Sequence, residues 1–172
     1  MTSTLIRAGH LDGLGSVYAP SGEIALRSGE RLLRRREGCE LSASGSWRIF
    51  FSKPIFHSQR GSAGVIYVTD ERIVFIRDID PWKEVKSLMT PLGMAGGTAD
   101  YVELKSIKAR GGRHYCEIPT THLRLHLARR RKGYADLRLS SEDKSRYEVY
   151  VWVKPDDPEF LSFVEGRFAR GS

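Results

Sequence analysis

Histidine and cysteine come first among the residues of this chain that could do chemistry, because imidazole nitrogens and thiolates bind metal ions. His122 and His126 have the spacing of a metal-binding pair on a helix, and His114 stands two residues before Cys116. The alternation around His122 predicts a strand, on which four residues span about 13 Å, too far for one zinc ion. On a strand, His114 and Cys116 would face the same way about 6.6 Å apart, with no second ligand pair in sight. No metal or cofactor is predicted.

A catalytic nucleophile or a phosphate-binding loop would leave a local signature, and neither is found. The chain has no Gly-x-Ser-x-Gly turn. Residues 93–97 are glycine-rich, but no Gly-Lys-Ser or Gly-Lys-Thr follows, so a flexible loop is expected. Cys39 and Cys116 are predicted to be free thiols of a cytosolic protein, with a disulfide between them as the alternative. The chain is expected not to be an enzyme.

Positive charge is concentrated in one part of the sequence. The net charge is +7, and the window from Lys105 to Lys132 alone holds nine basic residues and one acid, a net +8. A local positive field implies an anionic partner, and a solvated basic surface is the alternative. Within the window, four residues are predicted to form an exposed hairpin tip that meets an anion: Arg129, Arg130, Arg131 and Lys132. Arg124 and Arg113 are the other predicted anion-binding residues.

A second basic group, Arg34-Arg35-Arg36, lies near the start of the chain. On a strand Arg34 and Arg36 share one face and Arg35 points the other way. Three acids stand close in sequence and could neutralise the group: Glu30, Glu37 and Glu40. A structural or solvated role is therefore predicted for it.

The elements that would position these residues are mostly strands. Residues 64–77 contain two apolar, β-branched and aromatic segments joined by Thr69-Asp70-Glu71-Arg72, which predicts a β-hairpin. Both segments are apolar at nearly every position, so cover on both faces is expected. Leu123, Leu125 and Leu127 alternate with polar residues and predict a strand with one dry face.

The rest of the chain is assigned by the same patterns. Residues 1–22 are predicted to be an extension with little regular structure, 30–40 and 47–51 to be strands, and 54–62 a connection. A short helix is expected at 81–89 after the cap Asp80, whereas the period of 101–108 fits strand or helix. Two alternating strands follow, with Leu137 and Leu139 on one and Tyr147, Val149, Val151 and Val153 on the other. A closing helix from Pro158 would bury Phe160, Leu161, Val164 and Phe168.

The hairpin sequence Gly64-x-Ile66-Tyr67-x-Thr69-x-x-Arg72-Ile73-Val74-Phe75 resembles the signature of GRAM domains in the pleckstrin-homology superfamily. Three further segments agree in order: 29–33 with the opening strand, 117–119 with the strand after the hairpin, and 155–160 with the entry to the closing helix. The resemblance implies a mainly β (α+β) fold, a pleckstrin-homology-like antiparallel barrel of about seven strands closed by a C-terminal helix. Residues 1–28 would be an N-terminal extension, and 29–170 the domain with an insert at about 79–112.

The resemblance implies a non-enzymatic interaction module, often at membranes through phosphorylated lipid headgroups, or through proteins. An apolar part of the insert would add contacts to the membrane or a partner, with packing in the core or in a dimer as the alternative, through Trp82, Leu88, Met89, Leu92 and Met94. A protein- or peptide-binding module is the alternative, and nucleic-acid binding is less favoured. No apolar run approaches the ~20 residues that span a membrane. A cytoplasmic protein, peripheral at the inner face of the membrane, is expected, with homo-oligomerisation left open.

Overall fold

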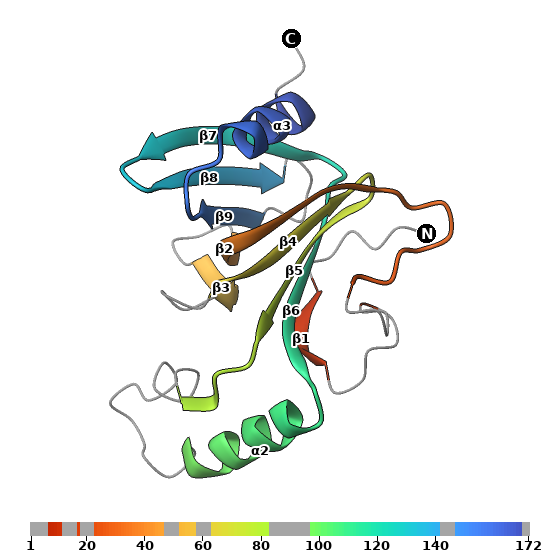
Figure 1. Ribbon diagram of the computed structural model, residues 1–172, viewed down its shortest axis with the longest axis vertical. Helices are drawn as coiled ribbons and strands as arrows, with labels where there is room; N and C mark the ends of the chain where they lie inside the picture. Colours follow the sequence, from red (N-terminus) through yellow and green to blue (C-terminus); the bar gives the residue numbers. More distant parts are fainter. Residues whose placement is uncertain are drawn as a thin grey trace.

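The computed structural model describes residues 7–11, 17, 23–46, 52–57, 63–82, 97–141 and 147–169. Nine strands and two helices make up this part of the chain (Figure 1): β1 (Arg7–Leu11), β2 (Leu32–Ser46), β3 (Ser52–His57), β4 (Gly64–Thr69), β5 (Arg72–Asp78), α2 (Gly97–Ala109), β6 (Arg113–Pro119), β7 (Leu123–Arg131), β8 (Tyr134–Ser141), β9 (Tyr147–Val153) and α3 (Pro158–Phe168). The fold is mainly β, as the sequence predicts.

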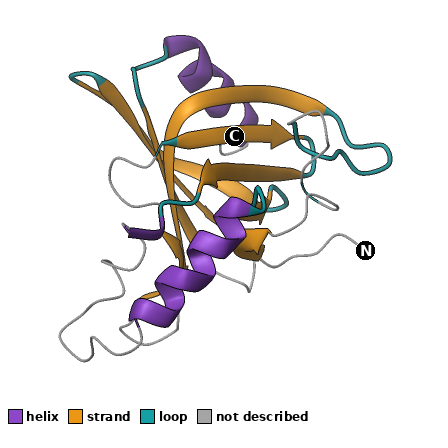
Figure 2. Cartoon of the chain, turned by 60° about the horizontal axis from the view of Figure 1, so that its bottom comes forward, coloured by secondary structure: helices purple, strands orange, loops and turns teal. Residues whose placement is uncertain are grey.

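All strand pairs are antiparallel, and their order along the sheet is β1-β6-β5-β4-β2-β9-β8-β7, with β3 paired to β2. Leaving out β1 and β3, seven strands remain, the number expected from the sequence. The order begins at β1 and ends at β7, and no hydrogen-bonded ladder joins these two ends in the described part of the chain. The predicted barrel is therefore not closed, and the sheet is an open, strongly bent one (Figure 2).

Strand β2 connects the two halves of the sheet. The first half consists of β1, β6, β5 and β4, and the second half of β9, β8 and β7. Its first part pairs with β4 and its second part with β9, and the register shifts between Arg36 and Cys39. Gly38 stands at this shift with φ of +70°, and its carbonyl accepts a hydrogen bond from Lys154 N–H. Glycine is the residue that adopts positive φ at little cost. The strand predicted at 30–40 is thus the first part of a longer strand that bends and continues to Ser46.

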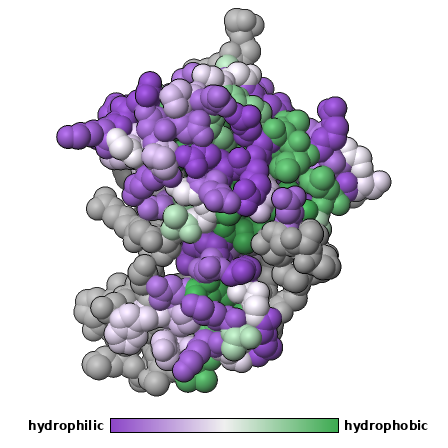
Figure 3. All heavy atoms as spheres, viewed as in Figure 1, coloured by the Kyte–Doolittle hydropathy of each residue, from purple (hydrophilic) through white to green (hydrophobic). Residues whose placement is uncertain are grey.

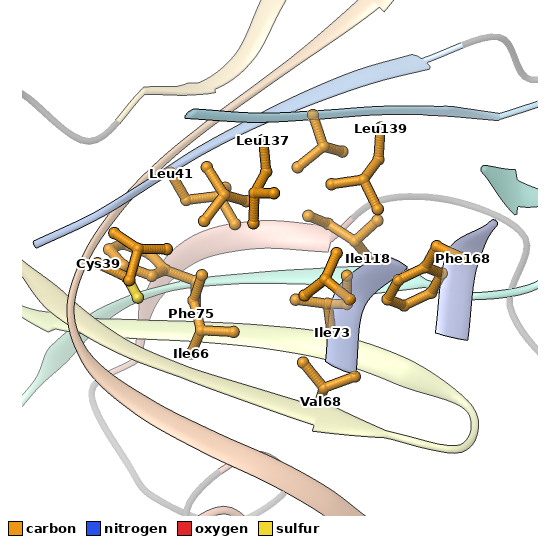
Figure 4. Close-up of a cluster of buried hydrophobic side chains, with 14 of the residues drawn as sticks. Cys39, Leu41, Ile66, Val68, Ile73, Phe75, Ile118, Leu137, Leu139 and Phe168 are labelled. Carbon is orange, nitrogen blue, oxygen red and sulfur yellow. The ribbon is translucent and has the colours of Figure 1, made fainter. Parts of the chain in front are cut away.

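The two halves enclose the main hydrophobic core, and α3 covers it from one side. Figure 4 shows side chains from both halves, among them Ile66, Phe75 and Leu137, pointing toward one another, with Phe168 reaching them from α3. Asp157 caps α3 by accepting a hydrogen bond from Phe160 N–H at 3.0 Å, and Pro158 begins the helix. The predicted stripe is buried at all four positions: Phe160, Leu161, Val164 and Phe168.

The hairpin predicted at 64–77 is confirmed as β4 and β5, and its second face is covered as expected. Ile66, Val68, Ile73 and Phe75 face the main core, whereas Tyr67, Val74 and Ile76 form a second cluster with Val17, Ile24 and Tyr115. The cover comes from the N-terminal part of the chain. Little regular structure is predicted for residues 1–22, but Arg7–Leu11 forms β1 and pairs with β6. The sequence of these residues alone does not predict a strand, because β1 depends on the edge of β6 with which it pairs.

The insert lies outside the main part of the sheet in its described residues. Residues 101–108, which fit strand or helix by period, belong to α2, whose Leu104 packs with Ile79 in a small third cluster. Helix α2 stands at the opposite end of the molecule from α3 (Figure 1). Pro81 and Trp82 are helical, and the remainder of the predicted helix, 83–89, lies outside the described residues, as does the predicted strand at 47–51. Pro54, predicted in a connection, lies in β3.

Candidate functional site: a basic hairpin on an open half-sheet

The predicted basic tip is found at the end of the β7–β8 hairpin. Arg129, Arg130 and Arg131 are the last residues of β7, and the turn itself is Lys132-Gly133. All four basic side chains are exposed. In Figure 3 hydrophilic residues protrude at the upper left, where Figure 1 places the tip. We use the name basic hairpin for Arg124, Arg129, Arg130, Arg131 and Lys132.

Two of the four tip cations are neutralised within the chain, which corrects the expectation of four charges meeting solvent together. Arg130 contacts the Asp156 carboxylate at 2.7 Å, and Arg131 contacts Asp136 at 2.9 Å. Arg130 is opposite Ala135, whose side chain faces the core, whereas Arg129 and Arg131 are opposite Asp136 and Tyr134 on the outer face. Alternation along a strand therefore divides the run between two faces. Arg129 and Lys132 have no carboxylate partner among the described residues.

The wider basic window does not form one surface. Arg124 lies near the start of β7, and Arg113 begins β6, where it forms an ion pair with Asp78. Lys105, Lys108 and Arg110 are exposed on or just after α2, at the far end of the molecule from the β7–β8 hairpin (Figure 1). A count of charge along the sequence joins residues that the fold separates.

The predicted apolar contact residues are described only at Trp82, which is 57% exposed and meets Tyr101 edge to face at 6.3 Å between ring centroids. Leu88, Met89, Leu92 and Met94 lie outside the described residues. Because Trp82 is close to α2, it does not share a surface with the basic hairpin.

The outer face of β8 and β9 carries a polar and aromatic group that the sequence reading missed. Arg138 binds Glu148 at 2.6 Å and lies over the Tyr150 ring at 5.5 Å, and Tyr150 stacks with Trp152 at 6.2 Å. The hydrogen bond from Arg138 lowers the pKa of Glu148, outweighing its partial burial. Tyr150 and Trp152 are only partly buried. Strand alternation places them on the outer face, but which aromatic residues stack depends on neighbouring strands.

Strand β7 also departs from the predicted alternation. Leu123 is buried and Leu125 partly buried, but Leu127 is 39% exposed. The register with β8 shifts between Leu125 and Leu127, so that Leu127 stands opposite the outward Arg138. The extra residue of a β-bulge moves every later side chain to the other face. A bulge of this kind leaves no mark in the period of the sequence.

Arg72 forms a buried ionic cluster on the outer face of the first half. Its guanidinium binds Glu30 through Nε at 2.8 Å and Nη2 at 3.0 Å, and Glu117 through Nη1 at 2.6 Å. Thr69 donates its hydroxyl to Glu30 at 2.7 Å. Burial raises the pKa of Glu30, but the hydrogen bonds from Arg72, Arg27 N–H and Thr69 outweigh it and leave the pKa below its ordinary value. We call Arg72, Glu30, Glu117 and Thr69 the Arg72 cluster, and its charges serve the fold.

The first basic group also acts within the fold. Arg34 binds Glu159 at 3.0 Å and Arg36 binds Asp157 at 2.8 Å, which connects β2 to the start of α3. Arg35 pairs with Glu37. Of the acids expected to neutralise this group only Glu37 does so, since Glu30 binds Arg72 and Glu40 binds Lys154.

Neither cysteine is placed for catalysis or disulfide formation. Cys39 and Cys116 are buried and free, as predicted. Burial raises the pKa of Cys39 to about 12 and raises that of Cys116 as well, so both are neutral thiols near pH 7. In the described part of the chain no three histidine, cysteine, aspartate or glutamate side chains cluster as a metal site. A cavity of about 10 Å³ beneath α3 is lined by apolar side chains and is too small for an organic ligand.

Comparison of this chain with protein-family models, curated proteins and solved structures finds no match. No helix in the described ranges is long and apolar enough to cross a membrane. Function is therefore inferred from the surfaces of the molecule itself.

Proposed function

We propose that this chain is a non-enzymatic interaction module of the pleckstrin-homology-like, GRAM type, which binds an anionic partner through the basic hairpin. Seven antiparallel strands with a C-terminal helix over the core support the fold part of this proposal. The observation that carries the binding part is the exposure of Arg129 and Lys132 at a hairpin tip, with no carboxylate partner among the described residues. Like charges held at a tip contribute nothing to folding, so they are available to a ligand.

Headgroups of anionic membrane lipids are the first candidate partner. Each Lys or Arg near an anionic surface contributes about 1 kcal/mol, so a tip with two unneutralised cations would give weak, salt-sensitive attachment. Trp82 lies near α2, away from the tip, so it would not insert into the membrane that the tip contacts. Membrane binding through the basic hairpin would depend on charge.

A protein partner is the second candidate, and the outer face of β7–β9 supports it. Leu127, Tyr150 and Trp152 are partly exposed there beside Arg138. Aromatic residues and arginine are enriched in protein interfaces. Nucleic acid is less favoured, because Asp136 and Glu148 interrupt the positive path that a phosphate backbone would follow on this face.

The proposal is tested with a double variant and a matched control. Arg129→Ser with Lys132→Ser removes the two tip cations, and Lys105→Ser with Lys108→Ser removes two exposed cations from α2. Binding is measured to phosphatidylcholine vesicles with and without phosphatidylserine, and to a polyglutamate peptide, at low and high salt. We expect the wild type and the α2 variant to bind at least one anionic ligand and the tip variant to lose most of that binding. Equal binding by all three proteins, or none by the wild type, refutes the proposal.

A further inference from the structure

The two ends of the sheet differ in how their strands are paired. At one end, β6 is paired on its outer side by β1, a five-residue strand from the N-terminal part of the chain. At the other end, β7 has nine residues and is paired with β8 alone among the described strands. An edge strand presents backbone N–H and C=O groups that can pair with another polypeptide. This sheet thus already accepts one short added strand, and in the described part of the chain the longer β7 edge has no second partner strand.

The β7 edge is basic from end to end. Residues 123–132 contain four arginines, one lysine and one histidine, and no carboxylate. Charged side chains and a bulge, both found on β7, are devices that discourage other strands from pairing with an edge. The same charges attract an acidic strand. The edge is therefore selective by charge.

An apolar rim runs beside this edge. Leu125 and Ala128 of β7 and Phe163 of α3 are the hydrophobic residues that pack against the main core while remaining only partly buried. Strand β7 and α3 are in contact with each other, and Leu125 and Ala128 lie on the edge strand itself. Elsewhere in the described part of the main core, neighbouring strands or helices bury the apolar side chains. At the β7 edge, an apolar side chain from a partner would complete the burial of Leu125 and Ala128.

We propose that the β7 edge binds an extended polypeptide segment of alternating acidic and apolar residues, which adds to the sheet as a further strand. This inference rests on the proposed function and names the partner. Successive side chains of an added strand point to opposite faces. On the outer face they lie beside Arg129, which has no carboxylate partner among the described residues and favours acidic side chains, and on the inner face beside Leu125 and Ala128, which favour apolar ones. Main-chain hydrogen bonds supply affinity and the alternation supplies specificity.

The test uses a synthetic peptide of alternating glutamate and valine, matched in length to β7. Its controls are the same peptide with lysine in place of glutamate, and the glutamate peptide with every second backbone nitrogen methylated. Amide hydrogen exchange of the protein is followed by NMR with and without each peptide. We expect the glutamate peptide to slow exchange at alternate residues of β7, and both control peptides to bind at least about tenfold more weakly, equivalent to about 1.4 kcal/mol.

Two substitutions on α3 add a second measurement. Phe163→Ala removes the apolar rim residue of the helix, and Glu165→Ala changes an exposed residue of the same helix. Phe163→Ala is expected to weaken peptide binding about tenfold, because the apolar side chains of the peptide would lose the ring that they cover. Glu165→Ala is expected to leave binding unchanged, and the spectra report whether both proteins are folded.

Several results would overturn the inference. They are no binding of the glutamate peptide, binding without protection on β7, protection at β6 instead, or equal binding of the methylated peptide. Loss of vesicle binding by the tip variant, together with no peptide binding, would overturn the inference and leave the proposed function standing. If the wild type binds neither the glutamate–valine peptide nor polyglutamate nor anionic vesicles, both proposals fail.

Discussion

The two halves of this sheet use arginine in opposite ways. In the first half Arg72 is 2% exposed and bound by Glu30 and Glu117, so its charge is matched inside the protein. In the second half Arg129 and Lys132 are exposed and lack a carboxylate partner among the described residues. A charge neutralised within the chain holds elements together, whereas one left to solvent can recognise a partner. Formal charge alone does not separate these roles.

The two halves also differ in how far their outer faces and their edge strands are covered. The outer face of β4–β6 is covered by a cluster that includes Val17 and Ile24, and its edge strand is paired by β1. The outer face of β7–β9 is partly exposed, and its edge strand ends the sheet. Among the described residues, the first half is therefore covered on its outer face and its edge, whereas the second half leaves both partly exposed.

The largest expected effect comes from breaking the Arg72 cluster. Arg72→Met leaves the buried Glu30 carboxylate without its cation and leaves Glu117 with Arg27 alone, which costs about 3–5 kcal/mol of unfolding free energy. Arg129→Met makes the same change at the exposed tip and is expected to cost less than about 0.5 kcal/mol. Urea unfolding of both variants measures the difference, and equal costs would abolish the contrast between the halves.

The next effect concerns the connection between the halves at Gly38. A Cβ at Gly38 would lie 2.1 Å from the carbonyl oxygen of Lys154, whereas at Gly29, also at positive φ, it would meet nothing within 4 Å. Gly29→Ala is expected to cost about 1–2 kcal/mol for its backbone conformation. Gly38→Ala should cost more, because β2 and β9 must also separate. Thermal unfolding that ranks the two variants in reverse would contradict the bend assigned to β2.

A smaller effect follows from the lowered pKa of Glu30. Its ordinary value is 4.5 and the folded value is lower, so the ionised form stabilises the fold above the ordinary value. That contribution is lost as the pH falls through the lowered pKa. Glu30→Gln should therefore be less stable than the wild type near pH 7, and the gap should shrink in acid. A gap independent of pH would show that Glu30 acts by packing alone.

The smallest effect on stability is expected at the tip. Arg129→Ser with Lys132→Ser should change the free energy of unfolding by less than about 0.5 kcal/mol, since both side chains are exposed and lack carboxylate partners in the described ranges. Differential scanning calorimetry at low and high salt measures it. A loss of several kcal/mol would mean that these cations are structural, and the second half would then resemble the first.

Local pattern was enough to predict the β4–β5 hairpin, the alternating strands β8 and β9, and the buried stripe of α3, because their signals lie within a few residues. The partners of the arginines are not local. Arg72 binds residues 42 and 45 positions away, and Arg130 binds Asp156 across 26 positions. Strand β1 depends on β6, and the bulge that exposes Leu127 depends on β8. Sequence therefore located the basic run, while tertiary contacts decided which of its charges remain available.

The central claim is that binding belongs to the second half, and a map of backbone amide shifts tests it most directly. A short polyglutamate peptide is added at low salt to the isotopically labelled protein, and every shifted amide is assigned. We expect the changes to fall on β7 and the Lys132-Gly133 turn, and to vanish at high salt. Shifts centred on α2, or on β4 and β5, would contradict the account.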